Sequence, residues 1–239
     1  MNDWKKIWNN KSVVSNGESV DEFQRFCELK KANGFDVAVD DSEKYYTSFY
    51  EGWIRFYERV MELSKGDINS VFEVGCGSGV NLYMFKNRLP EGCDFGGVDY
   101  SASMVESAKI STGCMDFECC GADAIDVETK YDIVMSESVF QYFESLEYAE
   151  IVLRKMICKA KKLVYLGEIH DKKFEQELLD YRRRTIENYD EKYAGLNKLF
   201  FEKEWIEKIA SEYGKKVKYS YIDNPEYING KYEFNCFII

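Results

Sequence analysis

The sequence predicts an α/β protein built on a seven-stranded sheet, mostly parallel, with helices on both faces and a C-terminal antiparallel hairpin. From residue 69 onward, short β-rich runs alternate with helical patterns. Apolar strands that alternate with helices are typical of a parallel sheet covered on both faces. After Gly214, two runs that alternate apolar and polar residues follow one another, which indicates an antiparallel pair.

Two parts are expected along the chain. Residues 1–66 look helical and rich in aromatic side chains, which predicts a helical N-terminal cap with a break at Gly34-Phe35-Asp36. Residues 67–239 are predicted to form the main domain, with a helical insert at about 172–202. The predicted strands are 70–75, 94–99, 116–122, 131–138, 162–169, about 216–222 and about 232–239. The predicted helices are 80–86, one with Ser101 as N-cap, 146–160, about 172–190 and about 203–213, and Asn229-Gly230 is a hairpin signal.

Composition and charge exclude several classes of protein. Hydrophobic residues make up 45% of the chain and aromatic residues 16%, which indicates a globular protein. The formal net charge is −11, whereas proteins that bind nucleic acid or anionic membranes present basic surfaces. Neither partner is therefore expected. Because no apolar run has the length of a membrane span and no secretory signal is seen, the expected compartment is the cytoplasm.

The cysteines do not predict a metal site. There are eight cysteines and one histidine, and no Cys-x-x-Cys pair occurs. Zinc sites need clustered thiolates and imidazoles. We expect reduced thiols that pack as small apolar side chains and no bound metal.

The stretch VFEVGCGSGV, residues 71–80, ends a predicted strand with three glycines, Gly75, Gly77 and Gly79. Such a turn lets the backbone approach a ligand closely. Val80 stands where the dinucleotide fingerprint requires its third glycine, and no Walker lysine follows. The pattern thus weakens an NAD site and excludes a phosphate-binding P-loop.

Acidic residues follow the next two strands. Asp99 ends the second strand, where a carboxylate can bind both ribose hydroxyls, and Asp123-Ala124 lies at the end of the third, where it can meet an adenine. The carboxyl ends of neighbouring strands are where open α/β sheets bind ligands. The set points to an adenosine that carries something other than a pyrophosphate.

On these motifs, residues of about 69–239 resemble the class I S-adenosylmethionine-dependent methyltransferases, which have a Rossmann-like fold. The likeness lies in Glu73 to Gly79, Gly97 to Ser101, Asp123-Ala124, Tyr131 to Val134, and Ser136 through Phe143. It implies S-adenosylmethionine as cofactor, S-adenosylhomocysteine as product, and a methyl-transfer site after the fourth strand. The cofactor-binding residues it implies are Glu73, Gly75, Cys76, Gly77, Asp99, Tyr100, Met104, Asp123, Ala124, Ser136 and Phe140.

A narrower likeness concerns methyltransferases of bacterial surface-polysaccharide gene clusters, those for capsule or lipopolysaccharide. It rests on the Trp-rich N-terminal helix, Asn33 to Asp36, Ser138 to Phe143, and Glu202 to Trp205. It implies a small acceptor such as a sugar or a nucleotide-linked sugar.

Methyl transfer to a hydroxyl needs a general base at neutral pH, whereas an amine acceptor only has to arrive unprotonated. His170 is the single histidine and follows the fifth strand at the same edge as the glycine loop. We expect it to be the catalytic base, with Glu168 and Asp171 as the other candidates. The alternative is an exposed loop histidine without a role.

Four residues are expected to bind the acceptor. Gln141 and Tyr142 follow strand four, although their neighbours can equally pack the start of a helix. Arg182 opens an Arg-Arg-Arg run that can hold a phosphate or carboxylate, but such runs are usually solvated helix faces. Tyr46 of the cap can offer its ring to the sulfonium or the acceptor, or simply belong to a small core.

The expected function is a methyltransferase that acts on a hydroxyl of a small polar acceptor. A small-molecule N-methyltransferase is the alternative, and His170 would then be dispensable. A non-catalytic S-adenosylmethionine-binding partner subunit is the alternative from another class, and an NAD oxidoreductase ranks below it. The acceptor and the oligomeric state stay open.

Overall fold

The computed structural model describes residues 4–14, 21–34, 43–222 and 224–239, with the side chain of Lys5 excepted. Phe35 and Asp36 of the predicted break lie outside these ranges. The helices before the sheet are α1 (Trp4–Asn9), α2 (Glu22–Asn33) and α3 (Glu43–Ser64). The strands are β1 (Ser70–Val74), β2 (Asp94–Asp99), β3 (Asp116–Cys119), β4 (Tyr131–Glu137), β5 (Ala160–His170), β6 (Val217–Tyr221) and β7 (Glu233–Ile238). The other helices are α4 (Val80–Lys86), α5 (Ala102–Thr112), η1 (Ala122–Ala124), η2 (Phe140–Tyr142), α6 (Leu146–Lys159), η3 (Lys172–Phe174), α7 (Glu175–Thr185), α8 (Tyr189–Lys192), α9 (Lys203–Glu212) and η4 (Ile228–Tyr232).

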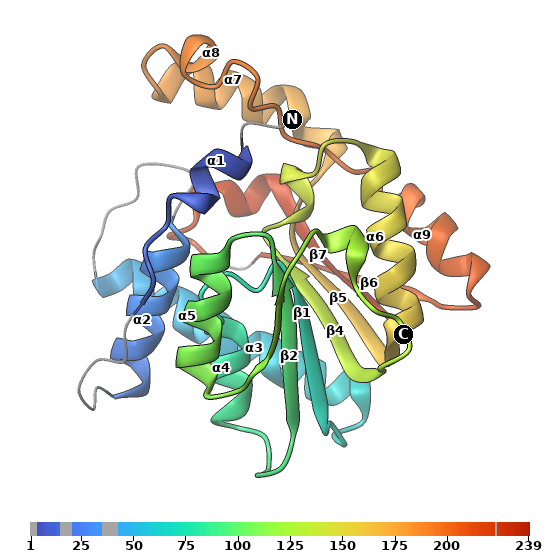
Figure 1. Cartoon of the computed structure of the whole chain (residues 1–239). Helices are drawn as coiled ribbons and strands as arrows, with labels where there is room; N and C mark the ends of the chain where they lie inside the picture. Colours follow the sequence, from blue (N-terminus) through green and yellow to red (C-terminus); the bar gives the residue numbers. More distant parts are fainter. Residues whose placement is uncertain (1–3, 15–20, 35–42, 223) are drawn as a thin grey trace.

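The described strands form one seven-stranded sheet in the order β3-β2-β1-β4-β5-β7-β6. Strands β1 to β5 pair in parallel, and β7 runs antiparallel to both β5 and β6. The predicted mostly parallel sheet with closing antiparallel strands is confirmed. The carboxyl ends of the parallel strands lie at the top of Figure 1, toward α1 and α7.

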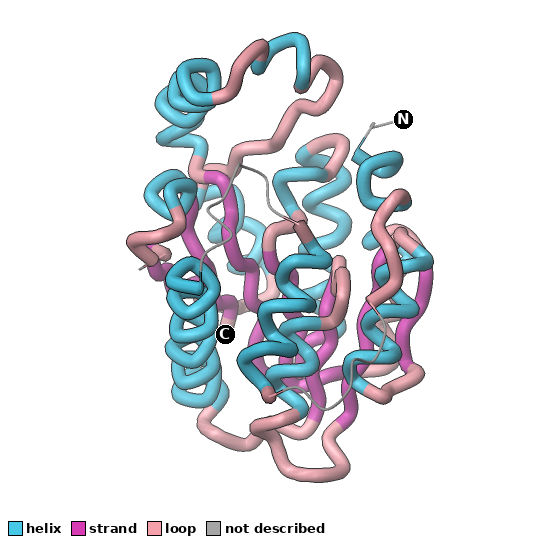
Figure 2. The backbone as a smooth tube through the Cα atoms, turned by 90° about the vertical axis from the view of Figure 1, so that its left-hand side faces the viewer, coloured by secondary structure: helices cyan, strands magenta, loops and turns pink. Residues whose placement is uncertain are grey.

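Helices cover both faces of the sheet (Figures 1 and 2). On one face, α6 and α9 bury Val152, Met156 and Ile206 against strand residues such as Val134. On the other face, α2 to α5 form a second core that includes Phe26, Trp53, Leu82 and Ala108. The strands are therefore apolar on both sides, as their near-continuous hydrophobic runs require.

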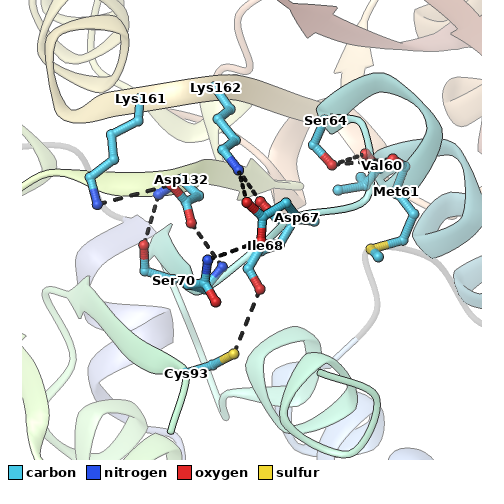
Figure 3. Close-up of polar contacts among 11 residues, drawn as sticks. Val60, Met61, Ser64, Asp67, Ile68, Ser70, Cys93, Asp132, Lys161 and Lys162 are labelled. Atoms are coloured by element: carbon cyan, nitrogen blue, oxygen red, sulfur yellow. Dashed lines mark hydrogen bonds and ion pairs between the residues drawn. The ribbon is translucent and has the colours of Figure 1, made fainter. Parts of the chain in front are cut away.

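The opposite, amino-terminal edge of the sheet is held by paired polar groups (Figure 3). The backbone N–H of Asn69 donates to Asp132 Oδ2 at 2.8 Å, and that of Asp132 donates to Ser70 Oγ at 2.8 Å. Lys161 lies 3.9 Å from Asp132 Oδ1, and Lys162 lies 3.7 Å from Asp67 Oδ2. These contacts hold the edge together, and none of the side chains drawn has a buried polar atom without a hydrogen-bond partner.

The hairpin signal Asn229-Gly230 lies, as predicted, in the connection between the antiparallel strands β6 and β7, where it is part of η4. Other local predictions were wrong in detail. The third strand ends at Cys119 rather than at 122, and the helix predicted over 172–190 is divided into η3, α7 and α8. Ser101 is the N-cap of α5, but its hydroxyl donates to Trp8 O at 3.1 Å instead of capping the helix. A tertiary contact with α1 has taken the place of the local hydrogen bond.

No helix in the described part of the chain is both long and apolar enough to cross a membrane.

Candidate functional site

The glycine loop after β1 adopts a backbone that side chains disfavour. Gly75, Gly77 and Gly79 have φ angles of 74°, 51° and 80°. A Cβ on Gly75 would lie 2.5 Å from Val139 Cγ2, and one on Gly77 would lie 2.6 Å from Asn33 Oδ1. A Cβ on Gly79 would lie 2.9 Å from Ala108 Cα, so all three glycines are required both by conformation and by the close approach of neighbouring elements.

Asp99 at the end of β2 is tied to this loop. Its Oδ2 accepts a hydrogen bond from Gly77 N at 3.0 Å and its Oδ1 accepts one from Ser101 N at 2.8 Å. Burial raises the pKa of Asp99, against the lowering effect of these two hydrogen bonds. Burial also raises the pKa of the neighbouring Tyr100. The carboxylate is held in a fixed position beside the loop, where the ribose-binding acid was expected.

Glu73, the first acid of the motif, is almost fully buried in β1. Asn81 Nδ2 donates to Glu73 Oε1 at 2.7 Å, and Trp53 Nε1 of α3 donates to Asn81 Oδ1 at 3.0 Å. The second carboxyl oxygen, Oε2, has no hydrogen-bond partner among the described residues. Burial raises the pKa of Glu73 well above its usual range, and the buried carboxyl group keeps unused hydrogen-bonding capacity at Oε2.

The other residues expected at the cofactor are more varied. Asp123 and Ala124 are exposed in η1, where Tyr148 OH donates to Asp123 Oδ1 at 2.8 Å. Ser136 Oγ donates to Val74 O at 2.9 Å and so joins β4 to β1. Three further residues are buried: Cys76, Met104 and Phe140. Burial raises the pKa of the Cys76 thiol well above its usual range. The Phe140 ring packs on Phe143.

His170 is the last residue of β5 and is 1% exposed, so it is neither an exposed nor a loop histidine. Its Nε2 lies 3.4 Å from Glu233 Oε1 on the neighbouring β7, and its Nδ1 has no hydrogen-bond partner in the described chain. Burial, with the charges of Lys198 and Arg182, lowers the pKa of His170 well below its usual range. Burial and the charge of Glu168 raise the pKa of Glu233. The imidazole is therefore neutral at neutral pH.

The two other candidate bases differ from one another. Glu168 has a φ of 55° and is 8% exposed, and its backbone N–H donates to Asn235 Oδ1 at 3.0 Å. Asp171 caps η3 through a 2.9 Å hydrogen bond from Lys173 N and lies 3.6 Å from Lys203 Nζ. Asp171 is occupied by structural contacts, whereas no hydrogen bond to the Glu168 side chain is found among the described residues.

The residues predicted to bind the acceptor lie partly in the core and partly against the N-terminal helices. Gln141 Nε2 donates to Ser138 Oγ at 3.0 Å, while its Oε1 is buried without a partner among the described residues. Tyr142 packs edge-to-face on Trp4 and Trp8 of α1, at ring distances of 4.8 and 5.9 Å. Tyr46 is buried against Tyr45.

The arginine run does not form one solvated face. Arg182 is 3% exposed and lies close enough to His170 and Glu233 to shift the pKa of both. Arg183 and Arg184 are exposed, and Arg183 pairs with Asp190. The prediction of a solvated run is wrong for Arg182, because the inner side of α7 packs on η4 and on the segment that contains Phe200.

A cavity of about 280 Å³ opens between α2, α3 and the sheet. Aromatic rings line its walls: Phe26, Phe49, Trp53, Phe56, Tyr165, Tyr221 and Phe237. Charged and amide groups also border it, among them Lys30, Glu137, Glu168 and Asn235. A cavity of this size with few convergent polar groups is typical of a small-molecule site.

Sequence reasoning missed Lys30, Glu137 and Glu233. Glu137 could have been found, because it ends β4 at the carboxyl edge of the sheet, where ligands bind. Nothing in the sequence marks Lys30, since α2 reaches the site only through tertiary packing. In the described ranges, no group of three or more His, Cys, Asp or Glu residues is arranged to hold a metal ion.

Comparison with known proteins agrees with this geometry. A family model described as a methyltransferase domain matches residues 71–158. Malonyl-[acyl-carrier protein] O-methyltransferase of Priestia megaterium is 26% identical over 114 residues, which cover 46% of this chain and 41% of the relative. The enzyme of that name from Acetivibrio thermocellus is 26% identical over 89 residues, covering 36% of this chain and 31% of the relative. The chain thus spans less than half the length of these curated relatives.

Solved structures share the fold. Magnesium protoporphyrin IX methyltransferase from Synechocystis PCC 6803 with bound SAH has a TM-score of 0.60 at 15% identity, covering 90% of this chain and 91% of that one. SAM-bound CalS10, an amino pentose methyltransferase from Micromonospora echinaspora, has a TM-score of 0.57 at 14% identity, covering 81% and 95%. A methyltransferase-domain model thus matches residues 71–158, and these solved methyltransferases share the fold of this chain.

Proposed function

We propose that this chain transfers a methyl group from S-adenosylmethionine to a hydroxyl of a small polar acceptor. The cofactor supplies a methyl group on a sulfonium, which is a good leaving group. The glycine loop and Asp99 would hold the adenosine, and Glu73 would face the methionine. We propose with it the division into a cap, residues 1–66, and a main domain, residues 67–239, with the insert at about 172–202.

The observation that carries the choice of a hydroxyl is the buried His170–Glu233 pair. A neutral imidazole can accept a proton, and an adjacent carboxyl group can orient the ring. The pair belongs to the strand ends that border the aromatic cavity, because Glu168 and Asn235 of these strands line it. In this proposal His170 takes the proton of the acceptor hydroxyl as the new O–C bond forms.

The cavity supports a small acceptor with a ring. Aromatic walls favour contact with the flat or apolar face of a ring, and the carboxylates of Glu137 and Glu168 can accept hydrogen bonds from hydroxyl groups. A sugar or nucleotide-linked sugar of surface-polysaccharide synthesis fits that description. The amino pentose methyltransferase among the structural neighbours also acts on a small sugar, as its name states.

An amine acceptor is the second candidate, and the same two carboxylates favour it. They would bind a protonated amine, which must lose its proton before the transfer. His170 would then be dispensable.

The test incubates methyl-labelled S-adenosylmethionine with the protein and a small-molecule cell extract, a macromolecular fraction and a panel of nucleotide sugars. Label in a small polar compound supports the proposal, and hydrolytic stability separates O-methyl from N-methyl products. Label in macromolecules would contradict it. Tight S-adenosylhomocysteine binding with no label anywhere would favour a non-catalytic partner subunit.

The second step uses the labelled acceptor with His170→Gln. For a hydroxyl acceptor, kcat should fall by about 10²- to 10⁴-fold, the usual contribution of a general base. Arg184→Gln, on the exposed side of α7, is the control. An unchanged kcat in His170→Gln would remove the base role and favour the amine.

A further inference from the structure

A bulge in β5 directs Glu168 into the aromatic cavity. The register between β5 and β7 shifts between Leu166 and Ile169, where Gly167 and Glu168 together oppose Asn235 alone. Glu168 has a left-handed φ of 55°, and its backbone N–H donates to Asn235 Oδ1 at 3.0 Å. Such a bulge changes the direction in which the next side chain points.

Without the bulge, Glu168 would face the opposite side of the sheet. Val164 and Leu166 belong to the core beneath α6 and α9, and the period of two along a strand would add Glu168 to that face. The inserted residue shifts Glu168 to the face covered by α2 and α3, where it lines the cavity together with Tyr165 and Phe237. The strand is thus interrupted at the residue that brings a carboxylate into the cavity.

The Glu168 carboxylate has no protein partner there. The residue is 8% exposed, and no hydrogen bond or ion pair to its carboxylate is found within the described ranges. Burying a carboxylate without donors is costly. An unpartnered carboxylate that lines a cavity indicates a ligand that donates hydrogen bonds to it.

The charges around the cavity favour a cationic donor. Lys30 Nζ lies 3.9 Å from Glu137 Oε1, which gives that carboxylate a partner. Burial lowers the pKa of Lys30, but carboxylates led by Glu168 and Glu137 outweigh this and raise it, so one buried ammonium serves both acids. Arg55 and Arg59 of α3 also line the cavity, at positions more open to solvent. The buried part of the cavity therefore has more negative than positive groups, and an ammonium is the complementary ligand group.

We propose that Glu168 binds a protonated amino group of the acceptor, so that the substrate is a small polar ring with an ammonium beside the hydroxyl that is methylated. This inference rests on the proposed function and deepens it, because it names the acceptor class and a specificity-determining residue. The aromatic walls support it, since a cation is also attracted to the face of an aromatic ring.

The position of Glu168 relative to His170 suits this acceptor. Ile169 packs in the core beneath α6 and α9, so the alternation of the strand returns His170 to the face of Glu168. Two residues on one face of a strand are about 7 Å apart, a separation that a substituted ring can span. An ammonium held by a carboxylate has no free electron pair, so the methyl group goes to the hydroxyl instead.

The test measures the affinity of three probes by isothermal titration calorimetry in the presence of saturating S-adenosylhomocysteine, at a slightly acidic pH. Glucosamine and glucose share one ring and differ in an ammonium against a hydroxyl, and N-acetylglucosamine keeps the nitrogen without the charge. Glucosamine should bind about 10- to 100-fold more tightly than either other probe, the effect of a charge-assisted hydrogen bond.

Glu168→Gln, which keeps the size and removes the charge, should abolish this preference and leave S-adenosylhomocysteine affinity unchanged. Glu58→Gln is the matched control, because it makes the same change at an exposed position of α3. It should keep the full preference for glucosamine.

Four results would overturn the inference while the cofactor site stood. These are equal affinity for glucosamine and glucose, no binding of glucosamine, a preference that persists in Glu168→Gln, and loss of S-adenosylhomocysteine binding in Glu168→Gln, which would indicate a structural role. If the unaltered protein did not bind S-adenosylhomocysteine, the proposed function itself would be overturned, and this inference with it.

Discussion

The two edges of the sheet treat their polar groups in opposite ways. At the amino-terminal edge, Asp132, Ser70 and Asn69 satisfy one another over short distances (Figure 3). At the carboxyl edge, buried atoms of Glu73, Gln141, His170 and Glu233 have no partner among the described residues. An unpaired buried polar atom costs about 1–3 kcal/mol, so the unpaired atoms at the carboxyl edge lower the free energy of unfolding. The comparison teaches that one edge is complete for folding, whereas the other keeps buried hydrogen-bonding capacity at the end of the sheet where open α/β sheets bind ligands.

The largest effect is expected from a substitution in the glycine loop at the carboxyl edge. Gly77→Ala places a Cβ 2.6 Å from Asn33 Oδ1 at a φ of 51°. Backbone strain and displacement of α2 should weaken the binding of S-adenosylhomocysteine by about 100-fold or more, as measured by calorimetry.

The control for that variant is Gly66→Ala. Gly66 has a similar positive φ of 81°, but a Cβ there would meet nothing within 4 Å. It should cost about 1 kcal/mol of unfolding free energy and leave affinity unchanged. Equal affinity loss in both variants would mean that backbone strain alone, and not the close approach, explains the effect.

The next effect compares one aspartate from each edge. Asp99→Asn should weaken the binding of S-adenosylhomocysteine by about 10- to 100-fold, because the carboxylate expected to bind the ribose loses its charge. Asp132→Asn should leave affinity unchanged and lower the free energy of unfolding by about 1–3 kcal/mol, since Asp132 is buried and bonded. Calorimetry and urea unfolding of both variants check the contrast, and it fails if the two aspartates exchange these effects.

A smaller effect concerns pH and Glu73. Because burial raises the pKa of Glu73 in the folded chain, its contribution to stability is full below the usual glutamate pKa and is lost as pH rises through the folded value. Between about pH 5 and about pH 8, Tm should therefore fall more in the unaltered protein than in Glu73→Gln. Thermal unfolding at both ends of this range measures it, and parallel pH profiles would contradict the assignment.

For His170, the pH dependence of stability should have the opposite sign. Its folded pKa is lowered, so the stability linked to it is lost as pH falls from the usual histidine value toward the folded one. His170→Gln should remove that acid-side loss in the same thermal measurements.

The smallest effect lies at the amino-terminal edge. Asp67 is 84% exposed at its side chain, and its ion pair with Lys162 is screened by water. Asp67→Asn should change the free energy of unfolding by at most about 1 kcal/mol and should not change affinity. A larger loss would show that this edge is held by more than its buried groups.

The sequence by itself determined the sheet and the glycine loop. Alternating apolar runs give the strand order along the chain, and the glycines with Asp99 mark the turn, because these patterns are local and short-range. The strands lie where they were predicted, within a few residues. The Asn229-Gly230 signal also marked the connection between the two antiparallel strands, but the sequence did not show that this connection contains η4.

The tertiary structure alone decided what surrounds the site. Sequence could not show that Arg182 is buried while Arg183 is exposed, since that depends on how α7 packs on η4 and on the segment that contains Phe200. It could not pair His170 with Glu233, 63 positions apart in the chain, because cross-strand register is a property of the assembled sheet. Nor could it bring Lys30 to Glu137, since α2 reaches the loop through contacts that only the folded chain makes.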